Sequence, residues 1–231
     1  MSVFVLVHGV WQGGWVWQRV APLLREGGHE AHALTLTGLS ERSHLLSASV
    51  GLNTHIQDVC AHIEAYDLWD VVLVGHGYGG QVVTAVADWL PDRLRGRVYV
   101  DAFVGADGDA AIDMLPARVA DRWRESVDEV GFGWLIPVRP LGMFGVTDES
   151  DVAWLSPRLT PHPWLAYSEP LRLTGARETP ARFVECVESR RVFRPQAERA
   201  AARGWPVHEL AAGHEAMVTA PKELADVLLE L

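Results

Sequence analysis

The most informative stretch of the sequence is Val71-Val72-Leu73-Val74-Gly75-His76-Gly77-Tyr78-Gly79-Gly80-Gln81. Its four leading apolar residues, mostly β-branched, predict a strand buried on both faces, because such strands carry apolar side chains without alternation. The glycines that follow favour a tight turn, and the pattern from Gln81 to Leu90 is that of a helix. The stretch therefore predicts a strand, a sharp turn and a helix in immediate succession.

Similar apolar runs recur on both sides of this stretch. They predict strands at Val3–Val7, Ala31–Leu36, Arg97–Val100, Arg182–Val187 and Trp205–Leu210, and helices at Gln18–Glu26, Leu52–Tyr66 and Lys222–Leu231. Strands that alternate with helices are typical of parallel sheets covered on both faces. We therefore expect an α/β fold with a mostly parallel, doubly wound sheet of about six strands.

The chain has 231 residues, of which 48% are hydrophobic, so we expect a single domain over 1–231.

One segment interrupts the alternation of strands and helices. The interval from about 105 to 179 carries seven of the thirteen prolines and four tryptophans. It follows the carboxyl end of a predicted strand, where open α/β sheets bind ligands. We interpret it as an inserted helical cap; a peripheral helical decoration is the alternative.

Two motifs overlap in the glycine-rich turn. Gly75 and Gly79 have the spacing of G-x-S-x-G, in which a nucleophilic serine sits on a strained turn between a strand and a helix. The central residue here is Gly77, which has no side chain. Gly75, Gly77 and Gly80 also match the dinucleotide fingerprint G-x-G-x-x-G, but that fingerprint follows the first strand of its domain, whereas about 70 residues precede this one. A dinucleotide-binding oxidoreductase is therefore the minor alternative.

Two further residues follow predicted strands in the order expected for a catalytic triad. Asp101 comes directly after the strand Arg97–Val100, and His214 follows the last strand. The order of nucleophile, acid and histidine is that of serine hydrolases with a G-x-S-x-G turn. We expect His214 to be a general base and Asp101 its partner, with Glu188 as the competing acid. A surface loop histidine and a strand-end aspartate are the plain alternatives.

The loop after the first strand is also glycine-rich. Its sequence is His8-Gly9-Val10-Trp11-Gln12-Gly13-Gly14-Trp15, and its backbone N–H groups are candidates to face a developing oxyanion. The candidate substrate contacts are Trp11, Trp15, His76 and Trp134. Aromatic residues also fill cores, and His8 and His76 more often pack or hydrogen-bond than react.

Together these segments resemble the α/β-hydrolase superfamily, and within it the small branch of hydroxynitrile lyases, methyl esterases and many bacterial esterases. The resemblance covers nearly the whole chain and rests on Phe4–Trp11, Leu36–Leu39 with Glu41–His44, Val74–Gly80, Asp101–Phe103 and Gly213–Met217. It implies an α/β-hydrolase fold with a serine at position 77 and His214 as general base, and with Val10 and Tyr78 donating N–H groups to an oxyanion hole. Many relatives carry the acid where Glu188 stands and others carry it one strand earlier, at Asp101, which we expect to be the acid.

The departure at Gly77 determines the expected activity. The resemblance implies a carboxylic ester or lactone hydrolase with a Ser-His-Asp type triad, and loss of a triad nucleophile costs on the order of 10⁶ in turnover. We therefore expect a nearly inactive chain. Gly77 is either an engineered replacement of serine or a natural feature. In the natural case the chain is a cyclase or lyase that uses His214 and Asp101 for proton transfer, or a small-ligand binding protein.

The composition of the chain limits the classes of partner that we expect it to bind. The formal charge of −10 comes from 30 acidic and 20 basic residues without a basic block, which argues against nucleic acid and anionic membranes. We expect a small apolar or aromatic ester or lactone as ligand; the sequence is also compatible with a homodimer. Cys60 and Cys186 indicate neither a disulfide framework nor a metal site, so we expect no cofactor or metal and a cytoplasmic location. The apolar run Val3–Val7 is too short for a signal peptide.

Overall fold

The computed structural model describes residues 1–188 and 192–230 and contains a parallel sheet of six strands. The strands are β1 (Val3–Val7), β2 (Glu30–Leu34), β3 (Val71–His76), β4 (Leu94–Val100), β7 (Ala181–Cys186) and β8 (Val207–Leu210). Their order across the sheet is β2-β1-β3-β4-β7-β8, and every neighbouring pair is parallel. The predicted α/β architecture and the number of strands are therefore confirmed.

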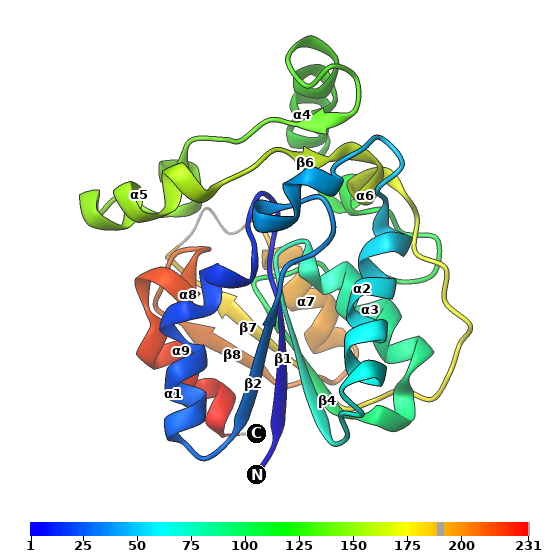
Figure 1. Cartoon of the computed structure of the whole chain (residues 1–231), viewed down its shortest axis with the longest axis vertical. Coiled ribbons are helices and arrows are strands. Elements are labelled where there is room, and N and C mark those ends of the chain that lie inside the picture. The colour runs from blue at the N-terminus through cyan, green and yellow to red at the C-terminus, as the bar shows by residue number, and fades with distance from the viewer. Residues whose placement is uncertain (189–191, 231) are drawn as a thin grey trace.

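Helices cover both faces of the sheet (Figure 1). One face is packed by α1 (Ala21–Glu26), α8 (Ala216–Thr219) and α9 (Pro221–Leu229), the other by α2 (Leu52–Ala65), α3 (Gly79–Trp89) and α7 (Arg194–Ala202). All six residues of β3 are buried between these two layers, which explains the continuous apolar run in its sequence. In α2 the buried residues Leu52, Ile56, Val59 and Ile63 recur at helical spacing on the face turned to the core.

The helix predictions need two corrections, and the end of a third helix cannot be compared. The segment predicted as one helix at Gln18–Glu26 is a 3₁₀ turn at Gly14–Arg19 followed by α1, because Pro22 suits the first turn of a new helix. Helix α7 lies between β7 and β8, where no helix was predicted. The terminal helix begins at Pro221 and ends at Leu229, and the predicted end at Leu231 lies outside the described residues.

The chain between β4 and β7 leaves the sheet. It contains α4 (Ala117–Glu129), α5 (Glu149–Leu155), α6 (Trp164–Ser168) and a two-stranded antiparallel sheet of β5 (Leu135–Ile136) and β6 (His162–Pro163). These elements lie over the carboxyl ends of the strands (Figure 1), where the sequence predicted a cap. In the described part of the chain, none of the helices combines the length and apolar character needed to cross a membrane.

Candidate active site

The turn between β3 and α3 has the backbone of a strand-to-helix elbow. Gly77 has a φ of +52°, in the left-handed region that favours glycine. Its N–H donates to the carbonyl of Val100 at 3.3 Å, and its own carbonyl accepts the N–H of Phe103 at 3.0 Å. The turn is therefore held against the end of β4, and residue 77 is fixed at the carboxyl edge of the sheet.

The glycines around residue 77 are required by space. A Cβ on Gly75 would lie 2.6 Å from Val83 Cγ2, and one on Gly79 would lie 2.8 Å from the carbonyl oxygen of Val7. A Cβ on Gly80 would lie 2.2 Å from the carbonyl oxygen of Phe103. Protein atoms thus fill the positions where these three glycines would carry a Cβ. The turn also follows β3 and not the first strand of the chain, which counts against the dinucleotide alternative.

Position 77 differs from its neighbours because a side chain there would press on another side chain and not on the backbone. A Cβ built there would lie 3.3 Å from His214 Nε2, so the His214 ring has to shift by a few tenths of an ångström, and the Cα of Gly9 lies 3.8 Å away. A serine at position 77 would also have to adopt the positive φ of Gly77. This strained backbone is the one that a G-x-S-x-G turn imposes on its serine. The turn can therefore accommodate a serine directed at His214.

His214 and Asp101 form a buried pair opposite this position. Asp101 follows β4 with a φ of +42°, and its Oδ2 accepts a hydrogen bond from His214 Nδ1 at 2.7 Å. With Nδ1 as the donor, the neutral ring presents Nε2 as a proton acceptor towards residue 77. Burial alone would lower the pKa of His214, but the hydrogen bond and charge of Asp101, with the charge of Glu215, raise that pKa above its ordinary value. Glu188, the competing acid, is solvent-exposed.

Two aromatic rings hold the His214 imidazole in place. The ring of Phe193 stacks on it with centroids 5.0 Å apart, and the His76 ring lies 4.3 Å away. His76 Nε2 donates to the His214 carbonyl at 3.0 Å, and burial followed by the His214 charge lowers the pKa of His76 well below its usual value. His76 is therefore a neutral ring packed beside His214.

The backbone groups expected to form an oxyanion hole lie beside Gly77. Val10 and Tyr78 both line the same cavity as Gly77 and His214. Tyr78 is the N-cap of α3, so its N–H has no carbonyl one turn earlier in the helix to accept it. The loop of Val10 is tied to the His214 loop through Gln12, whose Oε1 accepts the Gly9 N–H at 3.1 Å and whose Nε2 donates to Glu215 Oε2 at 2.6 Å.

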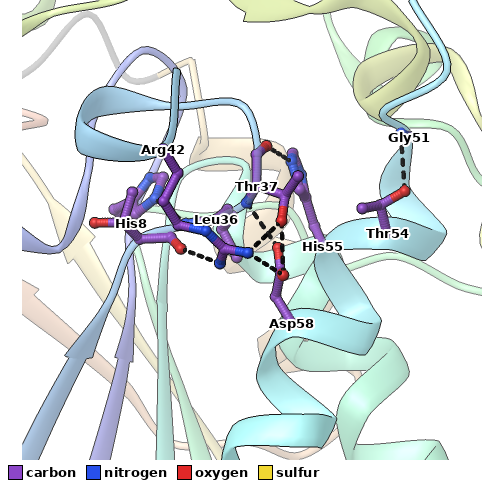
Figure 2. Close-up of polar contacts among 9 residues, drawn as sticks. His8, Leu36, Thr37, Arg42, Gly51, Thr54, His55 and Asp58 are labelled. Atoms are coloured by element: carbon purple, nitrogen blue, oxygen red, sulfur yellow. Dashed lines mark hydrogen bonds and ion pairs between the residues drawn. The ribbon is translucent and has the colours of Figure 1, made fainter. Parts of the chain in front are cut away.

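A hydrogen-bond network links Thr37, His55 and Asp58 (Figure 2). His55 extends this network to the Tyr78 side chain. The carbonyl of Thr37 accepts from His55 Nε2 at 2.9 Å, so Nδ1 accepts from the Tyr78 hydroxyl at 2.9 Å. Asp58 accepts both the N–H and the hydroxyl of Thr37, and Arg42 pairs with Asp58 at 3.1 Å. Burial lowers the pKa of His55 to about 4, which keeps this ring neutral. Sequence reasoning assigns no role to His55, because only the fold brings it to Tyr78.

The cap and the sheet edge enclose a cavity of about 160 Å³ with mostly apolar walls. It is lined by Val10, Gly77, Tyr78, Asp101, Leu115, Val119, Trp123, Arg139, Met143, Phe144, Tyr167, Val192, Phe193 and His214. The cap supplies most of the apolar wall. Sequence reasoning assigned none of these cap residues to the substrate, because an irregular segment has no periodicity to orient its side chains.

The four residues expected to contact substrate do not line this cavity. Trp11 packs on Trp123 with ring centroids 5.6 Å apart and supports the wall from behind. Trp15 packs against Trp154 on the α1 and α9 side of the sheet. Trp134 lies at the start of β5, and His76 lies beside His214.

His76, His214 and Glu215 also bring potential metal-ligand atoms within 4.8 Å of one another. Each of the three already hydrogen-bonds to protein, through His76 Nε2, His214 Nδ1 and Glu215 Oε2. Burial raises the pKa of Glu215 above its usual value. The hydrogen bonds of the cluster hold the His214 loop against the turn after β3 and the loop of Gln12.

Comparison with known proteins places this site in a family. The profile described as "Alpha/beta hydrolase family" matches residues 4–227. The chain belongs to the alpha/beta hydrolase family. It is 37% identical to the carbendazim hydrolyzing esterase of Nocardioides sp. (strain SG-4G), with all of both chains covered. It is 36% identical to methylesterase 8 of Arabidopsis thaliana over 44% of this chain and 38% of that protein.

Solved structures show the same fold. An extracellular alpha/beta-hydrolase from a Paenibacillus species has a TM-score of 0.89 at 23% identity, covering 100% of this chain and 98% of that one. Tomato methylketone synthase I complexed with 2-tridecanone has a TM-score of 0.78 at 18% identity, covering 99% and 96%. At these identities the likeness is one of fold.

Proposed function

We propose that this alpha/beta hydrolase is an ester or lactone hydrolase by descent that binds a small apolar or aromatic substrate and lacks the nucleophile at Gly77. The observation that carries the proposal is the distance of 3.3 Å between His214 Nε2 and a Cβ built at position 77. The name of the full-length relative from Nocardioides, an esterase, supports the reaction class. The apolar cavity walls support the substrate class.

With a serine at position 77, the site has the parts for acyl transfer. The serine oxygen attacks the ester carbonyl while His214 Nε2 takes its proton, and the Asp101 carboxylate stabilises the resulting imidazolium. The N–H groups of Val10 and Tyr78 donate to the tetrahedral oxyanion. His214 then returns the proton to the leaving alcohol, and water hydrolyses the acyl-enzyme.

The present chain keeps all of these parts except the first. Without a nucleophile, an oxyanion hole and binding leave about 10³ to 10⁴ of acceleration over water. This description suits an engineered Ser-to-Gly form that holds its substrate. It also suits a natural member that uses the His214–Asp101 pair for proton transfer in a cyclase or lyase reaction, or as a ligand-binding protein. The buried His214–Asp101 pair, joined by a hydrogen bond of 2.7 Å, favours the proton-transfer alternative among the natural ones.

The test is to restore the hydroxyl. Gly77→Ser is compared with Gly77→Ala, which adds the same Cβ and the same backbone strain without an oxygen. The proposal predicts burst release of nitrophenol from p-nitrophenyl esters by Gly77→Ser, and no burst from Gly77→Ala or the unmodified chain. Equal rates for all three proteins would refute the proposal that position 77 is an emptied nucleophile site and would favour the non-hydrolytic alternatives.

A further inference from the structure

Arg139 is the one cationic side chain among the described residues that line the cavity, apart from His214 when it is protonated. It lies in the cap between β5 and α5, immediately before Pro140. Most of the residues around the cavity are apolar, including Val119, Met143 and Phe144. Arg139 is half-buried, so the buried part of its guanidinium needs an acceptor or an anion.

Not all N–H groups of the Arg139 guanidinium have an acceptor among the described residues. Its Nη2 donates to the carbonyl of Arg122 at 3.2 Å, and this contact holds the side chain against α4. Its Nε is buried and has no hydrogen-bond partner, and Arg139 makes no ion pair with any described carboxylate. A buried donor without an acceptor is uncommon in proteins and indicates a missing partner.

We propose that Arg139 binds a carboxylate on the ligand, so that the site takes small molecules with an apolar or aromatic body and an anionic oxygen group; this rests on the proposed function. The planar guanidinium matches a carboxylate in geometry, and the apolar walls strengthen the attraction by excluding water. The chain carries a net charge of −10, which repels anions in general, so a local cation is needed for one to bind.

Two matched ligand pairs test the charge. Benzoate and phenylacetate are compared with benzamide and phenylacetamide, which have nearly the same shape and keep a carbonyl acceptor but carry no charge. Isothermal titration of the unmodified chain should show tighter binding of the carboxylates, and added salt should weaken that preference. Equal affinity for acids and amides would overturn the proposal, since Arg139 would then recognise a neutral acceptor.

Substitution of Arg139 tests whether this residue causes the preference for carboxylates over amides. Arg139→Gln keeps a donor for the Arg122 carbonyl and Arg139→Met keeps the apolar stem, so at least one of them should preserve the cap. Either variant should weaken carboxylate binding about 10- to 100-fold and leave amide binding unchanged. The matched control is Arg158→Met, because Arg158 also donates to a cap carbonyl, that of Trp154, but does not line the cavity. Unchanged carboxylate affinity in a folded Arg139 variant would overturn the proposal.

A third experiment distinguishes a failure of the Arg139 proposal from a failure of the proposed function. In the Gly77→Ser background, mono-4-nitrophenyl glutarate and 4-nitrophenyl pentanoate differ mainly in a terminal carboxylate. Arg139→Gln should raise KM for the glutarate at least tenfold more than KM for the pentanoate, with the effect on KM and not on kcat. If Gly77→Ser hydrolyses both esters and Arg139→Gln alters neither, the proposed function stands and the role of Arg139 falls.

Discussion

The turn at Gly77 and the loop at His214 meet in one cavity, but they differ in what they retain. The His214 side has its base, its acid and its packing: Asp101 accepts at 2.7 Å and Phe193 stacks on the ring. The Gly77 side has the backbone of a nucleophile turn, with each flanking glycine enforced by space, but no reacting atom. The comparison shows that backbone contacts build the turn at Gly77, so its geometry does not depend on a side chain at residue 77.

The largest expected effect removes the base from a restored enzyme. In a Gly77→Ser chain, His214→Ala should reduce kcat by about 10⁶, because the serine then has no group to take its proton. The rates of p-nitrophenyl ester hydrolysis measure this loss. A loss of less than about tenfold would show that the His214 side is not the catalytic partner of residue 77.

The next effect separates the two candidate acids. In the Gly77→Ser chain, Asp101→Asn should lower kcat by about 10⁴, because the amide favours the wrong tautomer of His214. Glu188→Gln, the matched control, should change little, since Glu188 is exposed. The reverse ranking of the two variants would assign the acid to Glu188.

In the Gly77→Ser chain, Asp101→Asn should also change the pH dependence of ester hydrolysis. The pKa of His214 is raised above 6.5, and the base must be neutral, so activity of Gly77→Ser should rise with pH through a midpoint above 6.5. Without the Asp101 charge, burial dominates, so Asp101→Asn should move this midpoint to lower pH. The pH profile of kcat/KM measures the shift, and an unchanged midpoint would contradict the assigned pairing.

A stability comparison sharpens the difference between residue 77 and its neighbours. Gly80→Ala should destabilise the fold by about 3 kcal/mol, because its Cβ would lie 2.2 Å from the Phe103 carbonyl oxygen. Gly77→Ala should cost about 1 kcal/mol, the strain of a left-handed alanine. Urea unfolding measures both. Equal losses would mean that residue 77 has no more room than the rest of the turn.

The smallest expected effect concerns the anchor of Tyr78. Tyr78→Phe removes the hydroxyl that His55 Nδ1 accepts and should destabilise the fold by about 1 kcal/mol. The backbone N–H of residue 78 remains, so kcat of a Gly77→Ser chain should fall less than about tenfold. A loss as large as that of Asp101→Asn would place the hydroxyl itself in the chemistry.

The periodic parts of this chain could be predicted from sequence, and the irregular parts could not. Apolar runs predict strands such as β3 (Val71–His76). The places of Asp101 and His214 directly after strands make them candidate site residues. Helix α7 was missed because its buried residues, including Gln196, Ala197 and Ala200, give a weak apolar pattern. The cavity residues Trp123 and Arg139 depend on how an aperiodic cap folds back, and the link from His55 to Tyr78 depends on tertiary contacts.

The most direct test of the central claim is covalent labelling of residue 77. A fluorophosphonate reacts with a serine only where a base and an oxyanion hole activate it. Gly77→Ser should gain one phosphonyl group, located at residue 77 by peptide mass spectrometry, whereas the unmodified chain and Gly77→Ala should gain none. A folded Gly77→Ser protein that stays unlabelled, or that is labelled elsewhere, would contradict the account that Gly77 occupies an otherwise intact nucleophile site.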